Sequence, residues 1–202
     1  RHVTVSNTDP GSGSSSLPNA FEVQNPPPLV TGIFPTTCSL GQALTVALAG
    51  EEFLDGVSSI DLGPGITVNS LACDNNGTHI NASISVSLDA LIGARSIVVT
   101  NVGPGGGSTT LAWSFTVVNP VPSLLSVSPA GGGKGKTLDV ALSGANYIQG
   151  TTKVEFGVGI TVNSVSVKSL TKILANITVA SDAIVGARGI VVVNPPPGGG
   201  SG

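Results

Sequence analysis

GARSIVVTNVGPGGGS, residues 93–108, recurs almost unchanged as GARGIVVVNPPPGGGS, residues 186–201. The two copies lie 93 residues apart, and GPGITVNSL from Gly63 returns 94 residues later as GVGITVNSV from Gly157. Self-similarity at a fixed period indicates a tandem array of one structural unit. The repeat therefore decides the domain organisation before any single residue is considered.

The period extends to both ends of the sequence, because Arg1, Arg95 and Arg188 occupy equivalent positions. It predicts three parts: residues 1–25 as the last two strands of a preceding repeat, 26–119 as a complete repeat, and 120–202 as a repeat that lacks its last strand. We expect the two ends to fall inside repeats and the Pro-rich joints after Asn25 and Asn119 to be short and stiff.

Within each period, short stretches alternate between apolar and polar residues, as in LTVAL at Leu44, HINASISV at His79 and WSFTVV at Trp113. About seven such stretches per ~94 residues, separated by turn residues, predict an all-β fold of tandem immunoglobulin-like sandwiches. The aromatic residues are expected in the core. These are Phe53 and Tyr147 at equivalent turns, and Phe21 and Phe115 in last strands.

Composition excludes several classes of protein. Charged residues make up 9% of the chain, the net charge is -3 and there are only 8 Lys and Arg, too few to coat a phosphate backbone. Nucleic acid is therefore not an expected partner. No apolar run approaches the roughly 20 residues that span a bilayer, so no membrane span is expected in this segment.

Glycines, prolines and aromatic residues recur in a fixed order: two prolines, a glycine, an alternating strand, G-x-x-F/Y, a Gly-rich turn, G-x-R-x-x-V-x-V and F-x-V. In one copy these are Pro28, Pro35, Gly41, Gly50, Phe53, Gly93, Val98 and Phe115, and in the next Pro122, Pro129, Gly135, Gly144, Tyr147, Gly186 and Val191. The pattern resembles the IPT/TIG family of immunoglobulin-like domains, as in repeats of bacterial or archaeal surface proteins. Turn glycines and core residues carry the resemblance, so it implies the fold far more than the function.

No constellation of residues predicts catalysis, a metal or a cofactor. AGGGKGKT, residues 130–137, fits a relaxed nucleotide-binding loop, but such a loop leads into a helix, whereas an alternating strand follows here. The acids Glu51, Glu52, Asp55 and Asp61 are mostly not matched in the second repeat and are interpreted as solvated turn residues rather than a calcium site. The chain is expected not to be an enzyme.

Cys38 and Cys73 are the only cysteines and lie 35 residues apart in one repeat. We predict a disulfide between them, which would cost the unfolded chain roughly 3–4 kcal/mol of entropy. Two buried thiols are the alternative, because the second repeat has Gly132 and Val167 at the corresponding places.

Three Asn-x-Ser/Thr triplets are candidate glycosylation sites: Asn76, Asn81 and Asn176. Asn76 lies in a predicted turn, whereas Asn176 interrupts a predicted strand. Two interpretations of these triplets remain open: they carry covalent glycans, or they are unmodified polar side chains.

The sequence thus favours a structural repeat of an extracellular fibre, stalk or adhesin shaft at the cell surface. Its expected partners are neighbouring identical repeats or subunits, arranged head to tail. The incomplete parts at either end indicate either an excerpt of one continuous array or strand addition between subunits, and the restart of the period after Arg188 favours the first. The alternative function is a cell-surface module that binds protein or carbohydrate.

Overall fold

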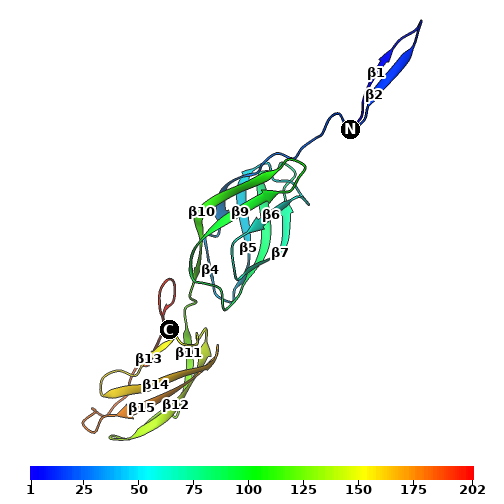
Figure 1. Cartoon of the computed structure of the whole chain (residues 1–202). Helices are drawn as coiled ribbons and strands as arrows, with labels where there is room; N and C mark the ends of the chain where they lie inside the picture. Colours follow the sequence, from blue (N-terminus) through cyan, green and yellow to red (C-terminus); the bar gives the residue numbers. More distant parts are fainter. The chain divides into compact units, whose positions relative to one another are not determined.

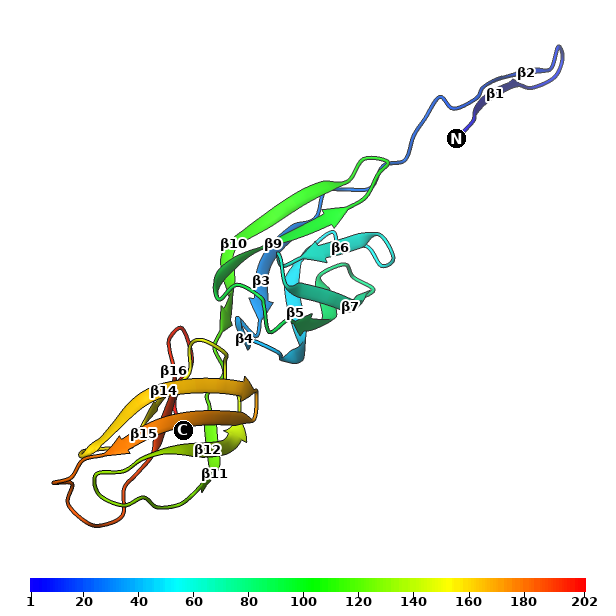
Figure 2. The same ribbon diagram turned by 60° about the horizontal axis from the view of Figure 1, so that its bottom comes forward.

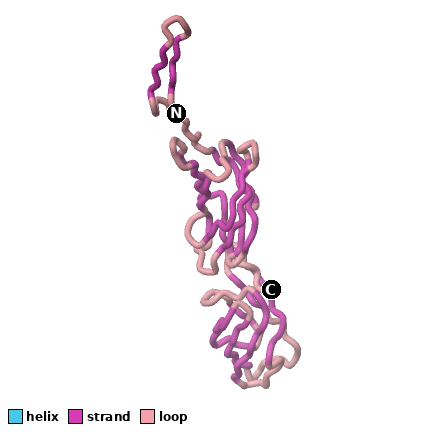
Figure 3. Tube along the Cα trace, turned by 90° about the vertical axis from the view of Figure 1, so that its right-hand side faces the viewer, coloured by secondary structure: helices cyan, strands magenta, loops and turns pink.

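The computed structural model describes residues 1–202 as strands, turns and loops without a helix (Figure 3). The chain forms two compact units, one from Arg1–Thr36, Ala43–Ser87 and Ala94–Thr116, the other from Thr37–Gln42, Leu88–Gly93 and Val117–Gly202. We refer to residues 26–119 as repeat 1 and to residues 120–202 as repeat 2. The lack of helix agrees with a chain in which glycine, proline and β-branched residues predominate.

Repeat 1 consists of β3 (Leu29–Phe34), β4 (Thr37–Ser39), β5 (Ala43–Glu51), β6 (Ser58–Asp61), β7 (Ile66–Cys73), β8 (His79–Val86), β9 (Gly93–Asn101) and β10 (Gly107–Val118). One sheet has the order β3-β5-β8-β7 and the other β4-β10-β9-β6 (Figure 1). This is the strand order of an immunoglobulin-like sandwich. The short strand β4, which pairs with β10, makes eight strands where the alternation predicts about seven.

Repeat 2 consists of β11 (Ser123–Ser128), β12 (Thr137–Ala145), β13 (Lys153–Glu155), β14 (Ile160–Ser169), β15 (Lys172–Val179), β16 (Val191–Asn194) and β17 (Gly200–Ser201). One sheet has the order β11-β12-β15-β14 (Figure 2) and the other β13-β16-β17. The first sheet repeats the order of β3-β5-β8-β7, so the two repeats share one fold. The second sheet has only the two-residue β17 where repeat 1 has the long strand β10.

The registers of the two repeats agree closely. In repeat 1, Leu48 pairs with Ile80, and in repeat 2, Leu142 pairs with Ile173. All four side chains are fully buried, because alternate residues of each strand face the opposite sheet. Phe53 and Tyr147 are 2% and 0% exposed, which confirms their predicted place in the core.

The N-terminal residues form a separate two-stranded ribbon of β1 (Val3–Asn7) and β2 (Gly13–Leu17), which pairs with no other strand. Every residue of both strands is exposed. The predicted core position of Phe21 is therefore wrong, because this side chain is 60% exposed and no sheet covers it. Its equivalent Phe115 on β10 is fully buried, as predicted.

Candidate functional site

A buried asparagine at the end of β9 joins three segments of repeat 1. The Nδ2 atom of Asn101 donates hydrogen bonds to the carbonyl oxygens of Pro26 (2.9 Å) and Glu52 (2.8 Å). Its Oδ1 accepts a hydrogen bond of 2.6 Å from the hydroxyl of Ser58. Asn101 is 1% exposed, so these bonds are formed away from water. A buried amide with all these partners fixes where Pro26 enters the repeat.

Repeat 2 contains the same network at the equivalent asparagine. Asn194 donates from Nδ2 to the carbonyl oxygens of Pro120 and Asn146, both at 2.8 Å. Its Oδ1 accepts a hydrogen bond of 2.7 Å from Thr152, which replaces the serine of repeat 1. Asn194 is fully buried. The network has therefore survived the sequence divergence of the two repeats.

A second asparagine, directly before each repeat, binds the turn between the last two strands of that repeat. The backbone N–H of Asn25 donates to the carbonyl oxygen of Pro104 (2.8 Å), and its carbonyl oxygen accepts from the N–H of Gly106 (2.6 Å). Its Nδ2 donates to the carbonyl oxygen of Val102 (2.7 Å). A Cβ atom on Gly105 would lie 2.8 Å from the carbonyl oxygen of Asn25, so only glycine fits in this turn.

Asn119 repeats these contacts before repeat 2. Its N–H donates to the carbonyl oxygen of Pro197 (2.8 Å), and its carbonyl oxygen accepts from the N–H of Gly199 (2.7 Å). Its Nδ2 donates to the carbonyl oxygen of Pro195 (2.8 Å). We call the network of Asn25 with Asn101, and of Asn119 with Asn194, the joint clamp of repeats 1 and 2.

Sequence reasoning identified the proline-rich joints but missed the joint clamp. Asparagine is common in turns, so Asn101 and Asn194 do not stand out in a single repeat. The signal was the alignment of the repeats, in which VVTN and VVVN end in the same residue. A conserved asparagine at the end of an apolar strand predicts a buried amide with backbone partners.

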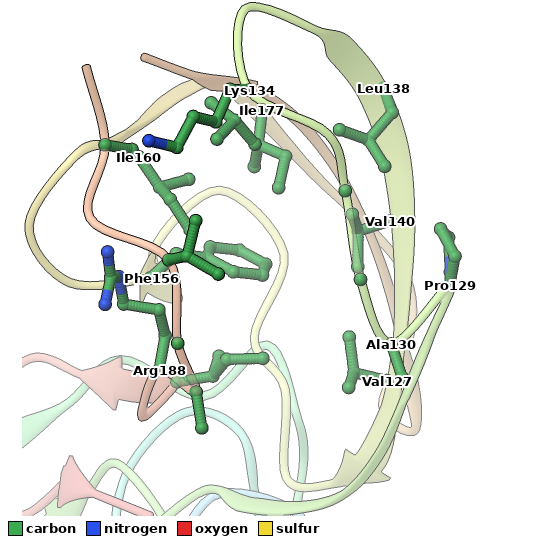
Figure 4. A pocket seen from close by; sticks show the side chains of 18 of the residues that line it. Val127, Pro129, Ala130, Lys134, Leu138, Val140, Phe156, Ile160, Ile177 and Arg188 are labelled. Atoms are coloured by element: carbon green, nitrogen blue, oxygen red, sulfur yellow. The ribbon is translucent and has the colours of Figure 1, made fainter. Parts of the chain in front are cut away.

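Repeat 2 has an apolar hollow of about 270 Å³ between its sheets. Figure 4 shows the ring of Phe156 in this hollow with Ile160 and Ile177 near it and Leu138 and Val140 across from it. The cationic side chains that line it are Lys134 and Arg188. Residues 130–137, which resemble a nucleotide-binding loop, line it with Ala130, Gly131, Gly132 and Lys134 and lead into the strand β12. The hollow is thus part of the sandwich interior.

A more open hollow of repeat 1 is lined by Glu51, Glu52, Asp55 and Asp74. Asp61 does not line it and accepts a hydrogen bond from the N–H of Gly63 (2.7 Å). No three acidic, histidine or cysteine side chains come close enough to share a metal ion. Asp74 accepts hydrogen bonds from the hydroxyl of Thr78 (2.8 Å) and the N–H of His79 (3.1 Å). These donors, Thr78 first, lower the pKa of Asp74 from 3.8 to about 2. The carboxylate therefore organises its own turn.

No disulfide joins Cys38 to Cys73 in the structure, so the predicted bridge is wrong. Cys38 lies on β4, an outer strand of its sheet, whereas Cys73 ends β7, which contacts β6 at the other edge of that sheet. The three strand spacings between β4 and β6 amount to roughly 14 Å, whereas a disulfide needs its two Cα atoms within about 7 Å of each other. Burial raises the pKa of the Cys73 thiol, which keeps it protonated.

The three candidate glycosylation sites differ in their surroundings. Asn76 is exposed in the turn before β8, and Asn81 is exposed on β8. Asn176 is half-buried on β15, and its Nδ2 donates a hydrogen bond of 2.6 Å to Asp139. The nitrogen that would carry a glycan is accessible at the first two sites and engaged at the third.

No helix of the chain is long and apolar enough to cross a membrane.

No protein-family model and no curated protein matches this sequence. Among solved structures, the titin immunoglobulin tandem domains A164-A165 align over 83% of this chain and 96% of theirs, at 11% identity and a TM-score of 0.30. A mixed-linkage glucan utilization protein of Bacteroides ovatus, SGBP-B, solved with a heptasaccharide, aligns over 99% of this chain and 47% of its own, at 17% identity and a TM-score of 0.31. Domains 5-6 of the S-layer protein SbsC align over 82% and 91%, at 16% identity and a TM-score of 0.27. The immunoglobulin-like assignment therefore rests on the strand order of the sheets.

Proposed function

We propose that this chain is a non-enzymatic structural segment of an extracellular fibre, stalk or adhesin shaft, built from tandem IPT/TIG-type immunoglobulin-like repeats. The observation that carries the proposal is the joint clamp, which occurs with the same bonds before repeat 1 and before repeat 2. A spacer needs each unit to grip the chain that enters it, whereas an isolated binding domain has no need to repeat such a grip.

The clamp is suited to tension because of where its bonds lie. Asn25 and Pro26 are bonded to residues 75 to 81 positions further along the chain, at the turn after β9 and at Asn101 itself. A pull on the N-terminal side of repeat 1 therefore acts on several hydrogen bonds at once before the sandwich core is loaded. The buried position of Asn101 protects its own bond to Pro26 from competition by water.

The low charge of the surface supports the idea of a covalent coat. Only 9% of residues are charged, and a long exposed fibre needs solvation from another source. Glycans on the exposed residues Asn76 and Asn81 would supply it.

Single-molecule pulling on the chain, tethered at both ends, tests the structural role. We expect two unfolding events, each releasing roughly 300 Å at about 3.4 Å per extended residue. Asn101→Ala should lower the force of one event and Asn194→Ala the force of the other. Asn69→Ala, which removes an exposed amide bonded to Ser85, is the matched control and should change neither force. Unchanged forces in both clamp variants would contradict the proposal.

A further inference from the structure

Repeat 2 leaves an open position for a strand beside β16. In repeat 1 the strand β9 runs over Gly93–Asn101, whereas its counterpart β16 covers only Val191–Asn194. The equivalents of the first half of β9, residues 186–190, form no strand, and neither do residues 131–133, the equivalents of β4. Both segments flank β10 in repeat 1, and repeat 2 has no strand of that length between them.

The apolar hollow of repeat 2 lies at this open position. Gly131 and Gly132 come from one of the two flanking segments and Arg188 and Ile190 from the other, and all four line the hollow. Its floor consists of side chains of the sheet β11-β12-β15-β14 and of Phe156, which follows β13 (Figure 4). We call the position between residues 131–133 and 186–190 the open strand slot.

Repeat 1 shows what fills the equivalent slot. Phe115 and Val117 of β10 point into the core and are fully buried. The N–H of Thr116 donates to the carbonyl oxygen of Thr36 (2.8 Å), and the carbonyl oxygen of Val118 accepts from Leu40 (3.0 Å), so β10 runs parallel to β4. An occupant of the open strand slot thus needs two apolar side chains, two residues apart, in an extended segment.

Residues 19–24, NAFEVQ, have this chemistry and nothing to pack against. Phe21 and Val23 lie 94 positions before Phe115 and Val117, and they are 60% and 55% exposed. Asn19 also has a φ of 55°, close to the 51° of the equivalent Trp113 on β10. The segment therefore already has a local feature of the last strand, while its apolar face is uncovered.

We infer that residues 19–24 of a second copy of this chain occupy the open strand slot of repeat 2. Phe21 and Val23 enter the hollow, and the backbone pairs in parallel with residues 131–133 and antiparallel with residues 186–190, as β10 does in repeat 1. Strand addition of this kind combines backbone hydrogen bonds with side-chain pockets. The inference rests on the proposed function, for which it names the contact between copies.

The donor segment and the open strand slot are different surfaces of the chain. The contact is therefore heterologous and propagates head to tail instead of closing a dimer.

Sedimentation velocity of the purified chain over a range of concentrations tests the inference. We expect oligomers that grow with concentration from the 19.9 kDa monomer. Phe21→Asp should give monomers, and its exposed position means that the fold is kept. Val5→Asp, at a side chain that is 67% exposed on β1, is the matched control and should assemble like the unaltered chain. Appending a copy of residues 110–119 after Gly202 should fill the slot from within and also give monomers.

Hydrogen exchange locates the contact. Amides of residues 186–190 should exchange at least tenfold more slowly in the assembled chain than in the Phe21→Asp monomer. A chain that stays monomeric at all concentrations, or oligomers that Phe21→Asp leaves intact, would overturn the inference. Either result would leave the joint clamp and its pulling forces unaffected, so it would not count against the proposed structural function.

Discussion

The hydroxyl of Ser58 donates a hydrogen bond of 2.6 Å to Oδ1 of Asn101 inside repeat 1, and both side chains are buried. The pair Thr152 and Asn194 repeats this bond at 2.7 Å in repeat 2. In both repeats the amide nitrogen binds the proline that enters the sandwich. The polar centre of each repeat therefore holds the residue with which the chain enters that repeat.

Asn101→Ala should lower the free energy of unfolding of repeat 1 by about 3 kcal/mol, because the variant leaves buried carbonyl groups and a hydroxyl without partners. Urea unfolding followed by circular dichroism measures this change. Asn69→Ala should stay within about 0.5 kcal/mol of the unaltered chain, because the Asn69 side chain is exposed. Equal losses of unfolding free energy in the two variants would contradict a specific contribution of the buried network to stability.

Gly50→Ala should destabilise repeat 1 by about 3 kcal/mol or more. A Cβ atom at this position would lie 2.0 Å from the carbonyl oxygen of Leu29 and 2.4 Å from Cζ of Phe53. Gly32→Ala on the neighbouring strand β3 is the control, since its Cβ would meet only Ala49 at 4.0 Å. Thermal unfolding of both variants checks the prediction, which fails if they melt at the same temperature.

The turn of Asp74 should loosen in acid. Its pKa is lowered from 3.8 to about 2, so the stabilisation by the carboxylate is present above about pH 4 and is lost as the pH falls towards 2. Thr78→Val removes the hydroxyl that contributes most and should raise the pKa towards 3.8. A carboxyl carbon NMR titration gives both values, and a midpoint near 4 in the unaltered chain would refute the account of this turn.

Thiol titration should find two reduced cysteines in the unfolded chain and slow reaction of both in the folded chain. Cys38 is buried, and the pKa of Cys73 is raised, chiefly by burial. If the chain unfolded without reductant yields no reactive thiol, the disulfide that the sequence predicts exists after all.

Glycan mapping of the chain from a glycosylating host should find Asn76 and Asn81 modified and Asn176 unmodified. A glycan on Nδ2 of Asn176 would break the 2.6 Å hydrogen bond to Asp139 within the sheet. Peptide mass spectrometry after enzymatic deglycosylation measures the occupancy of each site. A glycan on Asn176, with Asn76 and Asn81 unmodified, would contradict this prediction.

The fold could be predicted from the sequence because the repeat and the period-two alternation both report local structure. The stretches around Leu44, His79 and Trp113 lie in β5, β8 and β10, as predicted. The short strand β4 escaped prediction because three residues are too few for a pattern, and it exists only where β10 pairs with it.

Long-range contacts were harder to predict. Phe21 and Phe115 are equivalent positions of the repeat, yet one is exposed and the other buried, because burial depends on the sheet opposite. The bonds of Asn101 join residues 43 to 75 positions apart, which no local pattern reveals. The sequence spacing of Cys38 and Cys73 suggested a bridge, but this spacing does not reveal to which sheet each strand belongs.

Cryo-electron microscopy of the native material tests the central claim most directly. The account predicts a filament of beads with a spacing of roughly 35–45 Å per repeat, from strands of about 7–10 residues at ~3.3 Å each plus loops. Each bead should show the chain entering beside the turn between its last two strands, where Asn25 and Asn119 bind. Discrete monomers or dimers, with no filament, would contradict the structural role and favour a surface module that binds protein or carbohydrate.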